Sequence, residues 1–272
     1  MTFLDALILG IVQGITEFLP ISSSGHLVLG EALLGLDVEA LKSFDVAVHI
    51  GTLAAIIIYF WKDFVGLIMG FLSLIRIVKK KKKYEEYQRL VGYIVLGTIP
   101  AVIIGLFFGD LIDYLFRSPL YVGLFMIIVA EVFIIAEGVL KKFKNETEIK
   151  MGHALIIGVA QAAALIPGVS RSGSTIAAGI FQGVPREKAA RFSFLLAMPA
   201  IFGAGLLTLV KEIKADHFTV DAMPMIVGFI ASVGSGFVAV YFLMNFLKNH
   251  TLKVFSIYLF AIGFISVIIS LL

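Results

Sequence analysis

Six segments of this chain are apolar over roughly the length that crosses a lipid bilayer, which is about 20 residues of helix. They are Phe44–Trp61, Leu90–Phe108, Leu120–Leu140, Phe192–Val210, Ala222–Leu247 and Val254–Leu272. Four of the six contain no charged residue at all. Because a backbone surrounded by lipid must satisfy its polar groups internally, these segments predict an all-α polytopic membrane protein with six transmembrane helices.

The composition excludes the soluble classes of protein. Hydrophobic residues make up 60% of the 272 residues and charged residues only 15%, whereas soluble domains carry roughly a quarter charged residues. Such a chain cannot cover a surface that faces water, which excludes an ordinary cytosolic enzyme, a disordered regulator and a free nucleic-acid binder. There is no cysteine, so thiolate metal sites are excluded as well. We expect one integral membrane domain over residues 1–272, with no nucleic-acid partner.

Two further pairs of apolar stretches are too short to cross a bilayer easily, and each pair surrounds a break rich in Pro, Gly and Ser. The pairs are Leu4–Phe18 with about Leu27–Leu36, and His153–Ile166 with about Thr175–Gly183. Short half-helices around a polar break favour re-entrant helical hairpins, at about 4–36 and about 151–183. A kinked helix of full length is the alternative for each.

The positions of the basic residues predict the orientation in the membrane. Residues 62–90 hold eight Lys and Arg, including the run Lys79–Lys83, and residues 141–150, 186–191 and 248–253 hold four, three and two. The other connections hold four in all. Loops rich in Lys and Arg stay in the cytoplasm, and the lysine run also suits contact with anionic headgroups. The pattern is consistent only if the first hairpin starts outside and returns there, and the second does so inside.

The two breaks align with each other at a constant offset of 148 residues. Gly10 falls on Gly158, Gln13 on Gln161, Ser22 on Ser170, Ser24 on Ser172 and Gly25 on Gly173. Since the two hairpins start on opposite sides, we interpret residues 1–140 and 150–272 as an inverted-topology repeat. Such folds place their site near the middle of the membrane, where the broken helices meet.

Both breaks have the composition of a phosphate-binding site. The first reads ITEFLPISSSGHL over residues 15–27, and the second reads PGVSRSGST over residues 167–175. Each precedes a half-helix, whose N-terminus offers free N–H groups and a positive dipole end, so two facing ends can hold a diphosphate. The candidate substrate-binding residues are Ser22, Ser24, Gly25, Ser170, Ser172, Gly173 and Thr175. The serines can instead simply cap the helices.

The two breaks differ at the residues that carry charge. An arginine within an apolar segment is costly and suits bidentate binding of phosphate, so we expect Arg171 to bind an anion. Glu17 would repel that phosphate unless a divalent cation lay between them. We therefore expect Mg²⁺ or Ca²⁺ on Glu17, with Gln13 one turn earlier as a second oxygen ligand. A neutral buried acid and a partner of Arg171 are the alternatives for Glu17.

A histidine of the first break is a candidate for proton transfer. His26 follows Ser23 by three residues in the phosphate-like loop, which favours an acid/base role over that of a satisfied core histidine. Asp45 and His49 are four residues apart and can pair on one helical face, and Glu131 lies in another apolar segment. These last three are functional candidates because of their depth, but a structural role is equally compatible with the sequence.

These motifs resemble those of the undecaprenyl-diphosphatase family, the bacitracin-resistance phosphatases of bacterial cell-wall synthesis. The resemblance covers the whole chain. The first family motif, Glu or Gln followed after three residues by Glu, falls on Gln13 and Glu17, and its hallmark serine, histidine and arginine fall on Ser23, His26 and Arg171. The resemblance implies hydrolysis of undecaprenyl diphosphate to undecaprenyl phosphate and inorganic phosphate in the bacterial cell membrane. This reaction recycles the lipid carrier and gives resistance to bacitracin.

The chemistry of the residues agrees with that activity. Arg171 and the helix N-termini would hold phosphate oxygens, and a cation on Glu17 would neutralise charge that develops on the transferred group. Either Ser23 attacks with His26 as its base, or a metal-bound water attacks instead. The rival function is a transporter or flippase for a polyprenyl phosphate, because inverted repeats with broken helices also describe transporters. The orientation predicts a site open to the outer leaflet, and the oligomeric state is left open, a homo-oligomer included.

Overall fold

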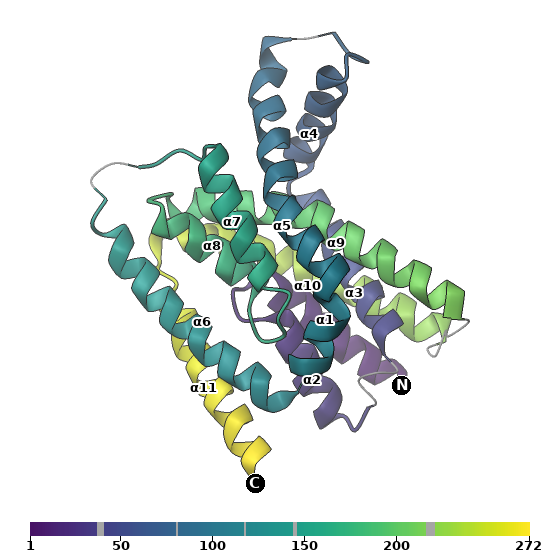
Figure 1. Cartoon of the computed structure of the whole chain (residues 1–272). Helices are drawn as coiled ribbons and strands as arrows, with labels where there is room; N and C mark the ends of the chain where they lie inside the picture. The colour runs from purple at the N-terminus through teal and green to yellow at the C-terminus, as the bar shows by residue number, and fades with distance from the viewer. Residues whose placement is uncertain (37–40, 80, 117, 144–145, 216–220) are drawn as a thin grey trace.

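The computed structural model describes residues 1–36, 41–79, 81–116, 118–143, 146–215 and 221–272, and over these ranges the protein is helical with no strand (Figure 1). The α-helices are α1 Phe3–Phe18, α2 Ser23–Leu33, α3 Lys42–Tyr59, α4 Trp61–Leu74, α5 Glu85–Phe116, α6 Pro119–Leu140, α7 Met151–Ala163, α8 Arg171–Phe181, α9 Arg186–Ala215, α10 Ala222–Asn249 and α11 Lys253–Leu271. One 3₁₀ turn, Lys82–Tyr84, precedes α5.

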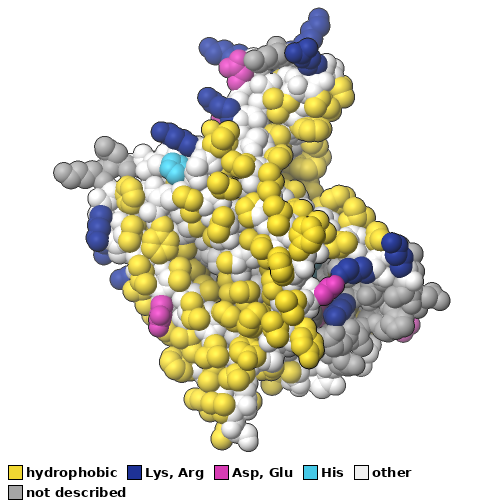
Figure 2. Space-filling view, viewed as in Figure 1, with side chains coloured by type: hydrophobic (Ala, Val, Ile, Leu, Met, Phe, Trp, Pro, Cys, Tyr) yellow, Lys and Arg dark blue, Asp and Glu magenta, His cyan; other side chains and the backbone are white. Residues whose placement is uncertain are grey.

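Six of the described helices are long and apolar enough to cross a membrane, namely α3, α5, α6, α9, α10 and α11. They confirm the six predicted spans. Large apolar side chains are exposed over the outside of these helices, and Figure 2 shows them covering most of one face, with Lys and Arg toward its margins. Lipid contact removes the need to bury such side chains, which explains their exposure.

The connection 62–90 differs from the predicted loop. Residues Trp61–Leu74 form α4, which packs on the first turns of α5 as an arm that projects at the top of Figure 1. Gly66 and Gly70 lie four residues apart on α4, and a side chain at either would collide with Tyr87. Two glycines on one face allow this close approach between helices. The 32 residues of α5 extend about 48 Å, which is longer than the roughly 30 Å hydrocarbon core.

The short helices α1 and α7 each pack closely against a long helix, with backbone in contact with backbone. A capping box between Thr2 and Asp5 starts α1, which packs along α10, whereas α7 packs along α5. Gly10 of α1 lies against the backbone of Gly228, and Gly158 of α7 lies against that of Gly97. A Cβ at either glycine would collide with the neighbouring helix. The two aligned glycines, Gly10 and Gly158, therefore allow the same close approach between helices in each half of the sequence.

A buried ion pair joins α6, α9 and the connection before α11. Glu137 is fully buried, and its carboxylate accepts hydrogen bonds from the Arg186 guanidinium and from the Leu252 backbone N–H at 2.9 Å. Among the described residues this carboxylate thus ties α9 and the start of α11 to α6. Glu131, by contrast, is exposed on α6, and so it does not line the interior of the bundle.

Candidate active site

The two breaks end at equivalent residues, because α2 begins at Ser23 and α8 begins at Arg171. Both starts come four residues earlier than the predicted half-helices. The Ser22 hydroxyl accepts a hydrogen bond from the Gly25 N–H at 3.3 Å, and the Ser170 hydroxyl accepts one from the Gly173 N–H at 3.1 Å. Ser22 and Ser170 are therefore helix caps, and they hold the first turns that carry Ser23 and Arg171.

Glu17, near the C-terminal end of α1, is the centre of the site. Its carboxylate is only 6% exposed. Oε1 lies 2.5 Å from Arg171 Nη2, and Oε2 accepts hydrogen bonds from Ser23 Oγ at 2.5 Å and from Gln13 Nε2 at 3.0 Å. His49 Nε2 lies 3.7 Å from Oε2. The predicted residues Gln13, Glu17, Ser23 and Arg171 thus come together around one carboxylate, although 154 residues separate Glu17 from Arg171.

His49 enters the site through a contact that differs from the pairing considered from sequence. Its Nδ1 lies 2.6 Å from the backbone carbonyl of Asp45, whereas the sequence suggested the Asp45 carboxylate as partner. A carbonyl only accepts hydrogen bonds, so the Nδ1 nitrogen of His49 carries the ring proton. The Nε2 nitrogen on the other side of the ring is the atom that lies near Glu17. Helical spacing brings His49 over Asp45, but only the packing of α3 on α1 brings it to Glu17.

The His26 ring faces α11. Its Nδ1 lies 2.7 Å from the Ser22 carbonyl and its Nε2 lies 2.7 Å from the Tyr258 hydroxyl. Because the carbonyl only accepts, Nδ1 carries the proton, and Tyr258 donates to Nε2 of the neutral ring. Within the described residues His26 makes no hydrogen bond to Ser23. Tyr258 was missed from the sequence, since a tyrosine in an apolar span carries no signal of a partner 232 residues away.

The three remaining hydroxyls of the predicted site, those of Ser24, Ser172 and Thr175, have different surroundings. Ser172 donates to the Leu19 carbonyl at 3.3 Å, which links the second break to the first. The Thr175 hydroxyl lies 2.6 Å from that of Ser193, so it joins α8 to α9. Ser24 instead lines a cavity beside the site. The structure therefore places Ser24 where it can reach a ligand, while Ser172 links the two breaks and Thr175 joins α8 to α9.

The two glycines after the caps allow close packing against α6. A side chain at Gly25 would collide with Met126, and one at Gly173 would collide with Phe133. Both helix N-termini are consequently pressed against the same helix. A larger residue at either position would push its N-terminus out of place.

The cavity beside Glu17 has a volume of about 390 Å³ and runs between α2, α3, α7, α8 and α9. Its polar lining includes Ser24, Lys42, Asp45, His49, Gln161 and Arg171, and its apolar wall includes Leu165, Ile201 and Ala204. The Nη1 atom of Arg171 is buried here without a hydrogen-bond partner. A charged head and an apolar chain can therefore be accommodated side by side.

The oxygen donors of the site suit a hard divalent cation. Gln13 Oε1 is buried without a hydrogen-bond partner, beside a carboxylate that its own amide group contacts. Among the described residues no group of three or more His, Cys, Asp and Glu surrounds one point. Glu17 and Gln13 would therefore need water and substrate oxygens to complete the coordination, as is usual for Mg²⁺.

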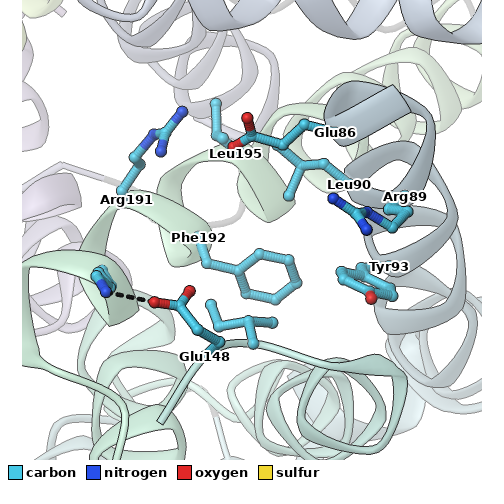
Figure 3. Close-up of a pocket in the computed structure, with 10 residues that line it drawn as sticks. Glu86, Arg89, Leu90, Tyr93, Glu148, Arg191, Phe192 and Leu195 are labelled. Carbon is cyan, nitrogen blue, oxygen red and sulfur yellow. Dashed lines mark hydrogen bonds and ion pairs between the residues drawn. The ribbon is translucent and has the colours of Figure 1, made fainter. Parts of the chain in front are cut away.

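A larger cavity, of about 540 Å³, lies near the start of α5 and α9 (Figure 3). Figure 3 shows charged side chains of both signs around the ring of Phe192. Glu148 accepts a hydrogen bond from Lys188 at 2.6 Å, and Arg191 pairs with Asp63 at 2.5 Å. Its charges largely neutralise one another, and it contains none of the motif residues. We therefore place the active site in the smaller cavity.

Comparison with known proteins shows the family to which the chain is similar. The family described as bacitracin resistance protein BacA matches residues 6–265. A protein of Methanosphaera stadtmanae named undecaprenyl-diphosphatase is 44% identical over 99% of each chain. Proteins with the same name from Thermodesulfovibrio yellowstonii and Rubrobacter xylanophilus are 44% and 40% identical, and cover 98% and 97% of this chain and 96% of their own. The similarity therefore extends over all the elements that build the site.

Proposed function

This chain belongs to the BacA family of bacitracin resistance proteins, and on that premise we propose that it hydrolyses undecaprenyl diphosphate to undecaprenyl phosphate and inorganic phosphate. It is a multi-pass membrane enzyme. The observation that carries the proposal is the cluster around Glu17, in which a hydroxyl and a guanidinium each lie within hydrogen-bond distance of one carboxylate. The reaction consumes the diphosphate and regenerates the lipid carrier, and this accounts for the resistance to bacitracin that the family description names.

The geometry favours Ser23 as the nucleophile and Glu17 as the acceptor of its proton. The Ser23 O–H already donates to Glu17 Oε2 at 2.5 Å. Attack would form a bond from Oγ to the terminal phosphorus and break the anhydride bond, so that undecaprenyl phosphate leaves with the electron pair. Water would then hydrolyse the phosphoserine and restore the Ser23 hydroxyl. Direct attack by water, positioned by the same carboxylate, is the alternative that the residues allow.

Arg171 and a divalent cation would supply the positive charge. The guanidinium begins α8, so its charge adds to the positive end of that helix. Bound to Glu17 and Gln13, Mg²⁺ or Ca²⁺ would neutralise charge on the transferred phosphoryl group. His26, held by Ser22 and Tyr258, is the remaining acid/base candidate, and it would act on a proton outside the Ser23–Glu17 contact.

We also propose that α1–α2 and α7–α8 are re-entrant hairpins of an inverted-topology repeat. None of these helices exceeds 16 residues, which is shorter than the bilayer requires. The equivalent starts at Ser23 and Arg171, 148 residues apart, support the repeat. With the eight basic residues of 62–90 in the cytoplasm, the first hairpin would start outside, and the site would open to the outer leaflet.

The test is release of phosphate by the purified chain in detergent. With undecaprenyl diphosphate and Mg²⁺, we expect turnover that Ser23→Ala reduces at least about 100-fold. Ser270→Ala is the matched control, because its hydroxyl only donates to the Ser266 carbonyl near the end of α11. Absence of phosphate release from the folded wild-type chain would refute the enzyme and favour a transporter, which needs no nucleophile.

A further inference from the structure

One polar side chain in the cavity beside Glu17 has no described partner. Gln161 of α7 is 2% exposed, and both its Nε2 and its Oε1 lack a hydrogen bond. Burying an amide without satisfying its donor or its acceptor is unfavourable, so such groups are rare in native proteins. The side chain lines the 390 Å³ cavity, and a ligand there that offers acceptor oxygens can satisfy its Nε2 donor.

The sequence repeat explains why Gln161 lacks a partner. Its equivalent in the first half, Gln13, donates to Glu17 at 3.0 Å. The residue that corresponds to Glu17 in the second half is Leu165, which lines the same cavity. The second half has thus kept the amide and replaced its acceptor by an apolar side chain. An acceptor supplied from outside the chain would complete the arrangement.

One more donor faces this cavity from another helix. Arg171 Nη1 is buried without a partner, while Nη2 of the same guanidinium is engaged by Glu17. His49 Nε2 lies 3.7 Å from Glu17, and its ring also lines the cavity. An amide and a guanidinium therefore approach one volume from α7 and α8. Donors of this kind suit the oxygens of a phosphate group.

We propose that Gln161, together with Arg171 Nη1, binds the phosphate attached to the prenyl chain and so positions the leaving group. This inference rests on the proposed function. The two Nη atoms of Arg171 then separate two positions, with the attacked phosphate on the side of Ser23 and Glu17 and the leaving phosphate in the cavity. The apolar wall at Leu165, Ile201 and Ala204 takes the first carbons of the chain.

The experiment compares Gln161→Leu with Gln182→Leu. Gln182 is the matched control because it follows α8 outside the cavity, where its Nε2 donates to the Ala178 carbonyl at 2.9 Å. Each purified protein is melted in detergent at constant Mg²⁺, with and without methylene diphosphonate, which cannot be hydrolysed, or inorganic phosphate. Values of kcat and KM are measured for farnesyl diphosphate.

We expect Gln161→Leu to melt no lower than the wild type in the absence of ligand, because it removes an unsatisfied amide. Its affinity for methylene diphosphonate should fall at least about ten-fold, the usual result of losing one hydrogen bond to a charged group. KM for farnesyl diphosphate should rise by a similar factor, with a smaller change in kcat. Binding of inorganic phosphate should change less, because the attacked position remains intact.

Unchanged diphosphonate affinity and unchanged KM in Gln161→Leu would overturn the proposal and assign the position to an ordered water. A lower melting temperature without a loss of affinity would overturn it in favour of a structural role. If the wild type binds diphosphonate but releases no phosphate from farnesyl diphosphate, the proposed function fails. The binding data on Gln161→Leu then still decide whether the phosphate site exists.

Discussion

Replacing Arg171 should lower both the free energy of unfolding and the turnover, and a second substitution at Glu17 should partly restore only the free energy of unfolding. The guanidinium, 15% exposed, and the Glu17 carboxylate, 6% exposed, form a buried ion pair between helices that are distant in sequence. Breaking a buried pair by removing one partner typically costs about 3–5 kcal/mol, because the other charge is left uncompensated. In Arg171→Met, Glu17 keeps its hydrogen bonds from Ser23 and Gln13. We therefore expect the lower end, a loss of about 3 kcal/mol in the free energy of unfolding.

The double variant Arg171→Met with Glu17→Gln tests the origin of that loss. With both charges removed, the free energy of unfolding should recover by about 1–3 kcal/mol relative to the sum of the two single variants. Turnover should not recover. Each variant should stay at least about 100-fold below the wild type, because about 3 kcal/mol of transition-state stabilisation is missing.

The assay is equilibrium unfolding in mixed micelles, followed by far-ultraviolet circular dichroism, with phosphate release measured on the folded fraction. Arg186→Met with Glu137→Gln is the control, because that buried pair lies outside the site; it should lose stability and keep its turnover per folded molecule. Near-normal turnover in folded Arg171→Met would refute the role of Arg171. Additive effects on stability in the double variant would refute the ion pair as a tie between α1 and α8.

Three further outcomes are expected. Glu17→Gln should weaken the dependence of residual turnover on Mg²⁺, and unchanged dependence on Mg²⁺ would place the cation elsewhere. His26→Ala should lower turnover and change its pH profile while leaving Mg²⁺ affinity intact. Tyr258→Phe should reproduce part of that change, with turnover reduced roughly two- to ten-fold, because one neutral hydrogen bond to the ring is lost. Wild-type rates in both variants between about pH 6 and 8 would show that the histidine is structural. Because the chain has no cysteine, Leu272→Cys should react with an impermeant thiol reagent in intact cells and Lys81→Cys should not, and the reverse pattern would remove outward access.

The sequence alone was sufficient for features that depend on local patterns. Hydropathy over about 20 residues predicted the six spans, because a helix in lipid must be apolar along its length. The break motifs also identified Gln13, Glu17, Ser23 and Arg171, since their polar side chains stand out in apolar surroundings. Helix α4 was not predicted, because the basic residues of 62–90 indicated a loop and the packing of Tyr87 on two glycines has no local signal.

Tertiary structure decided which of these side chains meet. Ser23 could have faced His26, three residues away on the same helix, yet its hydroxyl is directed to Glu17 while His26 contacts Tyr258. Gln161 looked equivalent to Gln13 in sequence, but only its position in the cavity reveals a polar group without a partner. Periodicity places a residue on a face of its own helix. What that face contacts depends on packing with helices far away in the chain, and so it appears only in the folded protein.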